Sequence, residues 1–191
     1  MIDRRTLLEA LVGLALAPAA LARAQRAPTG LARAQKAPAP AAPALATAFA
    51  TSPYIYVCPL LKDGAESTCH GEVWFGWIDG SAVVITASKS WKARSLERGL
   101  TRNRLWVGDF GRWKQLMGRN DTFRKAPSCM ARAERISDAS TIDNLLAIYE
   151  KKYPSEIANW RGPMRAGVKD GSRLMIRYVP EAAAAGGAAR T

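Results

Sequence analysis

The chain has 191 residues, with 28 lysines and arginines against 16 acidic residues and a formal net charge of +12. Such a charge favours anionic partners, whether phosphorylated cofactors, acidic lipids or nucleic acid. The sequence has no zinc-finger, helix-turn-helix or RNA-binding aromatic signature, which argues against nucleic acid. No apolar segment after residue 24 approaches the roughly 20 residues that span a bilayer, so we expect a mature chain without a transmembrane segment.

Residues 1–24 have the three parts of an export signal. Arg4 and Arg5 precede a weakly apolar run, and a small-residue cleavage site follows it, ending at Ala24. The paired arginines resemble a twin-arginine signal, a route that exports folded proteins, with general secretion as the alternative. The sequence LARAQ recurs at residues 31–35 and gives a second possible cleavage site after Ala34. We therefore expect a periplasmic or secreted protein.

Composition divides the rest of the chain into three parts. Residues 25–51 are mostly alanine and proline, which bury too little apolar surface to fold, so we expect a flexible linker. Residues 52–180 have the size of one domain with its own core. Residues 181–191 are rich in alanine and glycine, and we expect a disordered tail.

The first strand of the domain is predicted over residues 54–60, before a two-residue turn at Asp63-Gly64. Counting outward from this turn places Cys58 directly opposite Cys69, which is within disulfide range. Three cysteines in an exported protein permit one disulfide and leave one thiol, Cys129. The pair is therefore a candidate disulfide, and the alternative is that these thiols are free or buried.

The only histidine of the chain, His70, limits the chemistry that the sequence can support. It has no second imidazole beside it and the chain has no CxxC spacing, so no metal site is predicted. A single histidine also argues against a Ser-His or Cys-His hydrolase.

The segment from 74 to 96 carries the strongest local pattern. Runs rich in β-branched and aromatic residues flank Asp79-Gly80, the pair preferred in a type I′ hairpin turn. If the second strand ends near Thr86, hydroxyls and cations follow where the strand opens into a loop, a suitable place to hold a phosphate. The alternative is an ordinary hairpin followed by a solvated basic loop. The candidate phosphate ligands are Thr86, Ser88, Ser90, Lys92 and Arg94.

The remainder of the domain is predicted to contain two short strands over 104–107 and 128–136, a helix over 140–152 and a last strand over 173–179. The helix has apolar residues at helical spacing, with Ser140 and Asp143 able to cap its start. The last strand alternates Leu174, Ile176 and Tyr178 on one face with Arg173, Met175 and Arg177 on the other. Six strands, mostly antiparallel, predict a mainly β fold, a small barrel with helical decoration.

The order of these pieces resembles the FMN-binding split barrel of the pyridoxamine 5′-phosphate oxidase-like superfamily, including its deazaflavin-using branch. The resemblance covers roughly residues 54–180. Its specific parts are Trp74-Phe75, Thr86, the SWKAR segment at 90–94, Leu96, the strand at 105–108 and EKKY at 150–153.

This resemblance implies a six-stranded antiparallel split barrel in which the strand end and the SxK segment bind the phosphate and ribityl chain of a flavin. Thr86, Ser90 and Lys92 would take these roles, with Arg94 as an additional candidate. It also implies a homodimer, FMN or the deazaflavin coenzyme as cofactor, and an oxidoreductase acting on a small-molecule substrate. The segment 111–125 is unlike the usual short connection, and no vitamin B6 chemistry is predicted.

Two other classes of function are compatible with the same residues. One is a non-catalytic barrel that binds flavin, haem or another anionic ligand. The other is a structural or interaction domain whose basic surface contacts an acidic one. Four tryptophans, at positions 74, 77, 91 and 106, could wall a ring pocket or belong to the core.

Overall fold

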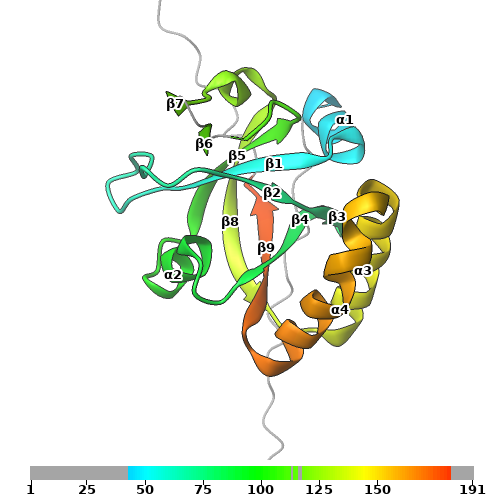
Figure 1. Cartoon of the computed structure of the whole chain (residues 1–191). Coiled ribbons are helices and arrows are strands. Elements are labelled where there is room, and N and C mark those ends of the chain that lie inside the picture. The colour runs from blue at the N-terminus through cyan, green and yellow to red at the C-terminus, as the bar shows by residue number, and fades with distance from the viewer. Residues whose placement is uncertain (1–42, 113, 116–117, 182–191) are drawn as a thin grey trace, which may run out of the picture. The chain divides into compact units, whose positions relative to one another are not determined.

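The computed structural model describes residues 43–112, 114–115 and 118–181 (Figure 1). Within them a seven-stranded antiparallel sheet in the order β2-β1-β5-β8-β9-β4-β3 curls into a nearly closed barrel. Its strands are β1 (Tyr54–Pro59), β2 (Gly71–Trp74), β3 (Gly76–Ile78), β4 (Ser81–Ala87), β5 (Arg102–Gly108), β8 (Ser128–Ile136) and β9 (Arg173–Pro180). The predicted mainly β barrel is confirmed.

The barrel sheet has one strand more than predicted, because the strand expected just before the Asp79-Gly80 turn is broken at Phe75. Its first half, β2, pairs with β1, and its second half, β3, pairs with β4. These two halves are neighbours in sequence but lie at the two ends of the strand order, so the barrel closes except at this split.

The predicted turn at Asp79-Gly80 joins β3 to β4. Asp79 has a φ of 49° and Gly80 a φ of 70°, the two positive values that a type I′ turn requires. Ile78 pairs directly with Ser81, so the loop has two residues. This local prediction is confirmed.

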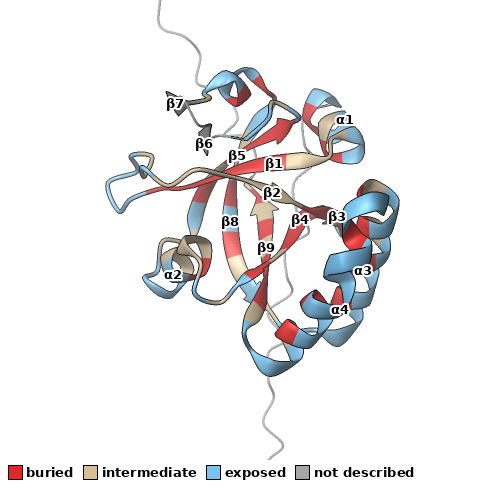
Figure 2. Ribbon diagram, viewed as in Figure 1, coloured by how far each residue is buried: buried red, intermediate tan, exposed pale blue. Residues whose placement is uncertain are grey.

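The barrel interior is filled by alternate residues of its strands (Figure 2). In β9, Leu174, Ile176 and Tyr178 lie in the interior cluster, whereas Met175 faces outward into a second cluster with the helices. The predicted two-faced pattern of this strand is therefore confirmed. The residues between them in each strand point to the outside of the barrel, where they can contact the helices or a ligand.

A helix, α1 (Pro43–Thr51), corrects the predicted linker boundary. Phe49 of this helix is 1% exposed and stacks on Trp77, with ring centroids 4.0 Å apart. Leu45 is buried in the same cluster. Composition was misleading for residues 43–51 because two apolar side chains suffice to attach an alanine-rich helix to the barrel.

The helix α3 (Ala139–Lys152) is as predicted, apart from its cap. Asp138, rather than Ser140 with Asp143, accepts the hydrogen bond of the Thr141 backbone N–H at 2.8 Å. A further helix, α4 (Pro154–Asp170), was not predicted, because Gly162 and Pro163 both have low helical propensity. It forms because Ile157 and Met164 are buried with residues of α3 and the outer face of β4 and β9. Figure 1 shows α3 and α4 side by side along the barrel.

The polar insertion between β5 and β8 contains two very short paired strands, β6 (Lys114–Gln115) and β7 (Gly118–Arg119), and a 3-10 turn, η1 (Thr122–Lys125). Phe123 of this turn is fully buried and stacks on Tyr56, with centroids 4.6 Å apart. The insertion therefore covers the outer face of β1 and β5.

Several predictions concern residues outside those described: the export signal at 1–24, most of the linker, and all but one residue of the tail. They stay predictions. Among the described residues, no helix is both long and apolar enough to cross a bilayer.

Candidate cofactor-binding site

The segment after β4 is a strand-to-helix junction. Thr86 is buried near the end of β4, and Ser90 is the N-cap of the short helix α2 (Trp91–Glu97). The Thr86 hydroxyl donates to Ser90 Oγ at 3.0 Å, and Ser90 Oγ also accepts from the Ala93 backbone N–H at 3.3 Å. Two of the predicted phosphate ligands are thus joined to each other, and one of them also starts the helix.

A hollow of about 260 Å³ opens beside Thr86. Two cationic side chains border it: Lys92 from α2 and Arg173 from the start of β9. The pairing of β4 with β9 places Thr86 opposite Leu174 and Ala87 opposite Arg173, which brings residues almost ninety positions apart to one place. The remaining lining residues are apolar or aromatic: Val73, Trp74, Ile85, Trp160 and Met164.

The two cations have no carboxylate partner within the described part of the chain. Lys92 Nζ lies 4.6 Å from the centre of the Trp91 ring, and the Arg173 guanidinium lies 5.5 Å from that of Trp160. Burial lowers the pKa of the Lys92 ammonium from its usual value, with no nearby carboxylate to offset the effect. A partly buried cation without a counter-charge is stabilised by an anion, so the hollow is electrostatically suited to phosphate.

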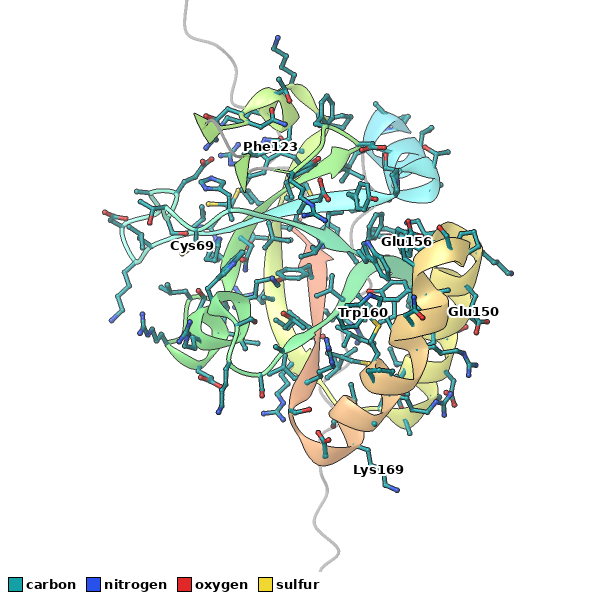
Figure 3. All side chains as sticks on the ribbon, in the orientation of Figure 1. Cys69, Phe123, Glu150, Glu156, Trp160 and Lys169 are labelled. Atoms are coloured by element: carbon teal, nitrogen blue, oxygen red, sulfur yellow. The ribbon has the colours of Figure 1, made fainter. Side chains whose placement is uncertain are left out.

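A close approach between α4 and β9 positions Arg173. A Cβ atom on Gly167 of α4 would lie 2.8 Å from both Cγ and Cδ of Arg173, closer than such atoms approach. The stem of Arg173 therefore occupies space that only glycine leaves open at this position. Trp160 of the same helix, labelled in Figure 3, is 46% exposed and lies against the guanidinium.

A second hollow of about 620 Å³ adjoins the first and shares Val73 and Trp74 with it. It extends along β2 toward the loop that precedes this strand, and its wall includes Trp91 and Arg112. The shared residues place the two hollows next to each other along β2. The remaining lining residues are Thr68, Cys69, His70, Gly71 and Glu72.

Trp74, which lines both hollows, is held by side chains from the end of α3. Tyr149 donates to the Trp74 carbonyl at 3.0 Å, and the Phe75 N–H donates to the Tyr153 hydroxyl at 3.2 Å. Lys152 Nζ donates to the Phe75 carbonyl at 3.2 Å. Phe75 lies between the pairings of β2 and β3, so its main chain lacks a strand partner, which Tyr153 and Lys152 replace. The Trp74 ring also stacks on Tyr153, with centroids 4.3 Å apart.

The four predicted cofactor ligands do not all reach the hollow. Thr86 and Lys92 line it, whereas Ser90 lies behind Thr86 and is hydrogen-bonded to it. Arg94 is exposed on α2 and is absent from the lining of both hollows. The sequence predicted a loop after Thr86, in which Lys92 and Arg94 could have pointed to the same side. Because the segment is instead a helix beginning at Trp91, these two side chains point to different sides.

Sequence reasoning missed Arg173 and Trp160. Arg173 was assigned to the outward face of the last strand, but no pattern in the sequence indicates that this strand pairs with β4. Trp160 lies in a helix that was not predicted at all. Of the other tryptophans, Trp74 and Trp91 wall the hollows, whereas Trp77 packs on α1 and Trp106 is buried under the insertion.

The predicted disulfide between Cys58 and Cys69 is absent from the structure, in which Cys58, Cys69 and Cys129 are all free thiols. The predicted register is wrong: the assumed count puts Leu60 opposite Ser67 and Val57 opposite His70, whereas Leu60 pairs with Glu66 and Val57 pairs with Gly71. Cys58 Sγ instead lies 3.5 Å from the Ser67 carbonyl, and burial raises the pKa of its thiol to about 11.

Comparison with known proteins gives structural similarities only. No family model matches the sequence, and no curated protein matches it significantly. A conserved hypothetical protein from Mycobacterium tuberculosis is 20% identical, with a TM-score of 0.50 over 78% of this chain and 85% of that one.

Two further solved structures are similar at lower scores. HutZ, a heme storage protein from Vibrio cholerae, is 15% identical, with a TM-score of 0.49 over 73% of this chain and 89% of its own. A putative pyridoxamine 5′-phosphate oxidase from Listeria innocua is 12% identical, with a TM-score of 0.44 over 72% and 91%. At these identities the comparison concerns the fold alone, and the match at 0.50 places this barrel among folds seen in solved structures.

Proposed function

We propose that this chain binds a flavin-type cofactor, FMN or the deazaflavin coenzyme, with the cofactor phosphate in the hollow between α2, α4 and β9. One observation carries the proposal: Lys92 and Arg173, both without a carboxylate partner in the described residues, border the same hollow as Thr86. An anionic group is the ligand that satisfies all three. The resemblance of the SWKAR segment to split-barrel flavin proteins supports the choice of cofactor.

The hydroxyl pair adapts to such an anion by rotation alone. Without ligand, Thr86 donates to Ser90. With a phosphate in the hollow, Thr86 would donate to it, and Ser90 would donate its own proton to Thr86 Oγ1, since a hydroxyl both donates and accepts. Ser90 thus acts as a positioning residue, while its oxygen still caps α2.

The bound ring would supply hydride or electron transfer, and the chain would supply binding and orientation. Trp74 and Trp160 offer flat apolar surfaces beside the phosphate position, and β2 continues from there into the larger hollow. This larger hollow offers room for the rest of the cofactor or for a small-molecule substrate. We propose an oxidoreductase on this basis, with a non-catalytic barrel that binds flavin, haem or another anionic ligand as the alternative.

The remaining parts of the proposal rest on the sequence. The twin-arginine-like segment supports export to the periplasm or beyond, and the resemblance to split-barrel proteins supports a homodimer. Cell fractionation and the measured mass in solution test these two points independently of the cofactor.

The decisive experiment is a titration of the full chain with FMN, the deazaflavin coenzyme and riboflavin, which lacks the phosphate. We expect FMN or the deazaflavin coenzyme to bind, and Lys92→Ala and Arg173→Ala each to weaken that binding about 10- to 150-fold, the range of a lost charge-assisted hydrogen bond of roughly 1.5–3 kcal/mol. Riboflavin binding should change little in the same variants.

Arg94→Ala is the matched control, because it removes a cation from the same helix outside the hollow. A folded wild-type protein that binds none of the flavins, or equal effects of all three substitutions, would reject the site. Once a flavin is bound, its reduction and reoxidation by small-molecule substrates separates an oxidoreductase from the non-catalytic alternative.

A further inference from the structure

Three side chains of different metal-binding chemistry converge outside the smaller, cationic hollow. They are Cys58 from β1 and Glu66 and His70 from the segment that joins β1 to β2. The thiol sulfur, a carboxylate oxygen and an imidazole nitrogen all lie within 4.8 Å of one another. The spacing of these residues did not predict this cluster, because the segment from Glu66 to Gly71 pairs with β1 in a register different from the one assumed.

This set of donors matches the preference of zinc. Thiolate, carboxylate and imidazole are the three ligand types of Zn²⁺, and three protein ligands plus a water are a common arrangement. With bonds of about 2.0–2.3 Å, ligand atoms in a tetrahedral site lie roughly 3.3–3.8 Å apart. His70 Nε2 already lies 3.5 Å from Glu66 Oε2. The other donor pairs lie within 4.8 Å and would have to approach this spacing for the three atoms to share one metal ion.

The guanidinium group of Arg124 already lies beside two of these three ligands. The Arg124 guanidinium of η1 lies 2.7 Å from Glu66 Oε2 and 3.1 Å from His70 Nε2. The second oxygen of Glu66 is paired with Arg104 Nε at 3.2 Å. Arg124 therefore marks a location where positive charge is stabilised, and it competes with any metal for the same two ligands.

Arg124 has an alternative place to go. Its side chain is 39% exposed, and its Nε is 3.3 Å from Asp121, which would still hold it after it left Glu66. The ligands themselves are more fixed: Cys58 is fully buried on a barrel strand, and the His70 ring lies about 6 Å from the rings of Trp106 and Phe123. Phe123 is labelled in Figure 3. A metal would thus meet preformed ligands on the protein side and a displaceable guanidinium on the solvent side.

We propose that Cys58, Glu66 and His70 form a Zn²⁺ site from which Arg124 is displaced on binding. When the bond between sulfur and metal forms, the Cys58 thiol releases its proton to solvent, and a water molecule completes the coordination. This site shares no residue with the smaller, cationic hollow, and one of its residues, His70, also lines the larger hollow. Zinc binding measured without any flavin therefore tests this site separately from the proposed cofactor.

The test is a titration of the full chain, free of any histidine tag, with Zn²⁺ by calorimetry and with Co²⁺ by absorption. Since the chain has a single histidine, no other imidazole competes. We expect one equivalent of zinc to bind, and cobalt to give the charge-transfer band of a thiolate ligand. Cys58→Ser should abolish that band, and both Cys58→Ser and His70→Gln should weaken zinc binding by more than the roughly 10- to 100-fold that outer-shell partners contribute.

Two further variants separate this site from accidental binding. Cys129→Ser removes a thiol outside the cluster and should leave binding unchanged. Arg124→Gln removes the competing cation and should tighten zinc binding about fivefold, the factor that an ion pair of ~1 kcal/mol represents. Folded wild type that binds no zinc at micromolar concentration, a cobalt band that survives Cys58→Ser, or weaker binding in Arg124→Gln would overturn the proposal.

Discussion

The barrel split depends on the hydroxyl of Tyr153, and removing it with Tyr153→Phe tests that dependence. The hydroxyl accepts from the Phe75 N–H at 3.2 Å and donates to the Pro53 carbonyl. Phe75 is fully buried and Tyr153 is 4% exposed, so water cannot replace the hydroxyl at the Phe75 N–H. The substitution would leave a buried donor without a partner.

The expected loss follows from that unpaired donor. A buried polar group left unsatisfied costs about 1–3 kcal/mol, while Pro53 is partly exposed and can regain water. We therefore expect the free energy of unfolding to fall by about 2 kcal/mol, and the melting temperature by roughly 5–10 °C for a domain of this size. Urea denaturation followed by circular dichroism measures the first quantity, and a thermal scan the second.

Tyr178→Phe is the matched control for this measurement. Tyr178 is 1% exposed and, within the described residues, its hydroxyl makes no hydrogen bond. The same chemical change breaks no hydrogen bond there and should therefore cost clearly less than it does at Tyr153. If the two variants lose equal stability, the hydroxyl of Tyr153 does not support the split, and the reasoning about Phe75 is wrong.

Three other predictions concern the elements around the site. Phe49→Ala should lower the free energy of unfolding by about 3–5 kcal/mol in a denaturant titration, because Phe49 is buried against Trp77. Thr47→Ala, on the exposed side of α1, should leave it nearly unchanged. Equal small effects of the two substitutions would mean that the helix is not part of the domain. Ser90→Ala should cost about 1 kcal/mol through loss of the α2 cap, and Ser90→Asn should restore most of that stability. Burial lowers the pKa of Lys152 to about 8, below its unfolded value of 10.5, so the unfolded state binds more protons between these two values. The free energy of unfolding of the wild type, minus that of Lys152→Met, should therefore rise as the pH increases from about 8 to 10.5. A difference between their urea midpoints that does not change with pH would contradict the burial of this ammonium.

The sequence by itself determined the features that depend on neighbouring residues. The turn at Asp79-Gly80 was predictable because both positive φ values are a property of those two residues. The two faces of β9 and the apolar stripe of α3 followed from periodicity, since a strand repeats every two residues and a helix every 3.6. Thr86 and Lys92 were identified because hydroxyls and cations at a strand exit form a local pattern.

Other features were decided only by contacts between distant segments. Arg173 borders the hollow because β9 pairs with β4, and no local pattern encodes which strands become neighbours. The helix α4 forms against its own propensity because burying Ile157 and Met164 offsets the cost of Gly162 and Pro163. A pairing register different from the one assumed, with Leu60 opposite Glu66 and Val57 opposite Gly71, left Cys58 and Cys69 unlinked and brought Glu66 and His70 to Cys58 instead. The sequence thus specified which chemical groups were available, and strand pairing and burial specified which of them meet, because these energies depend on the whole domain.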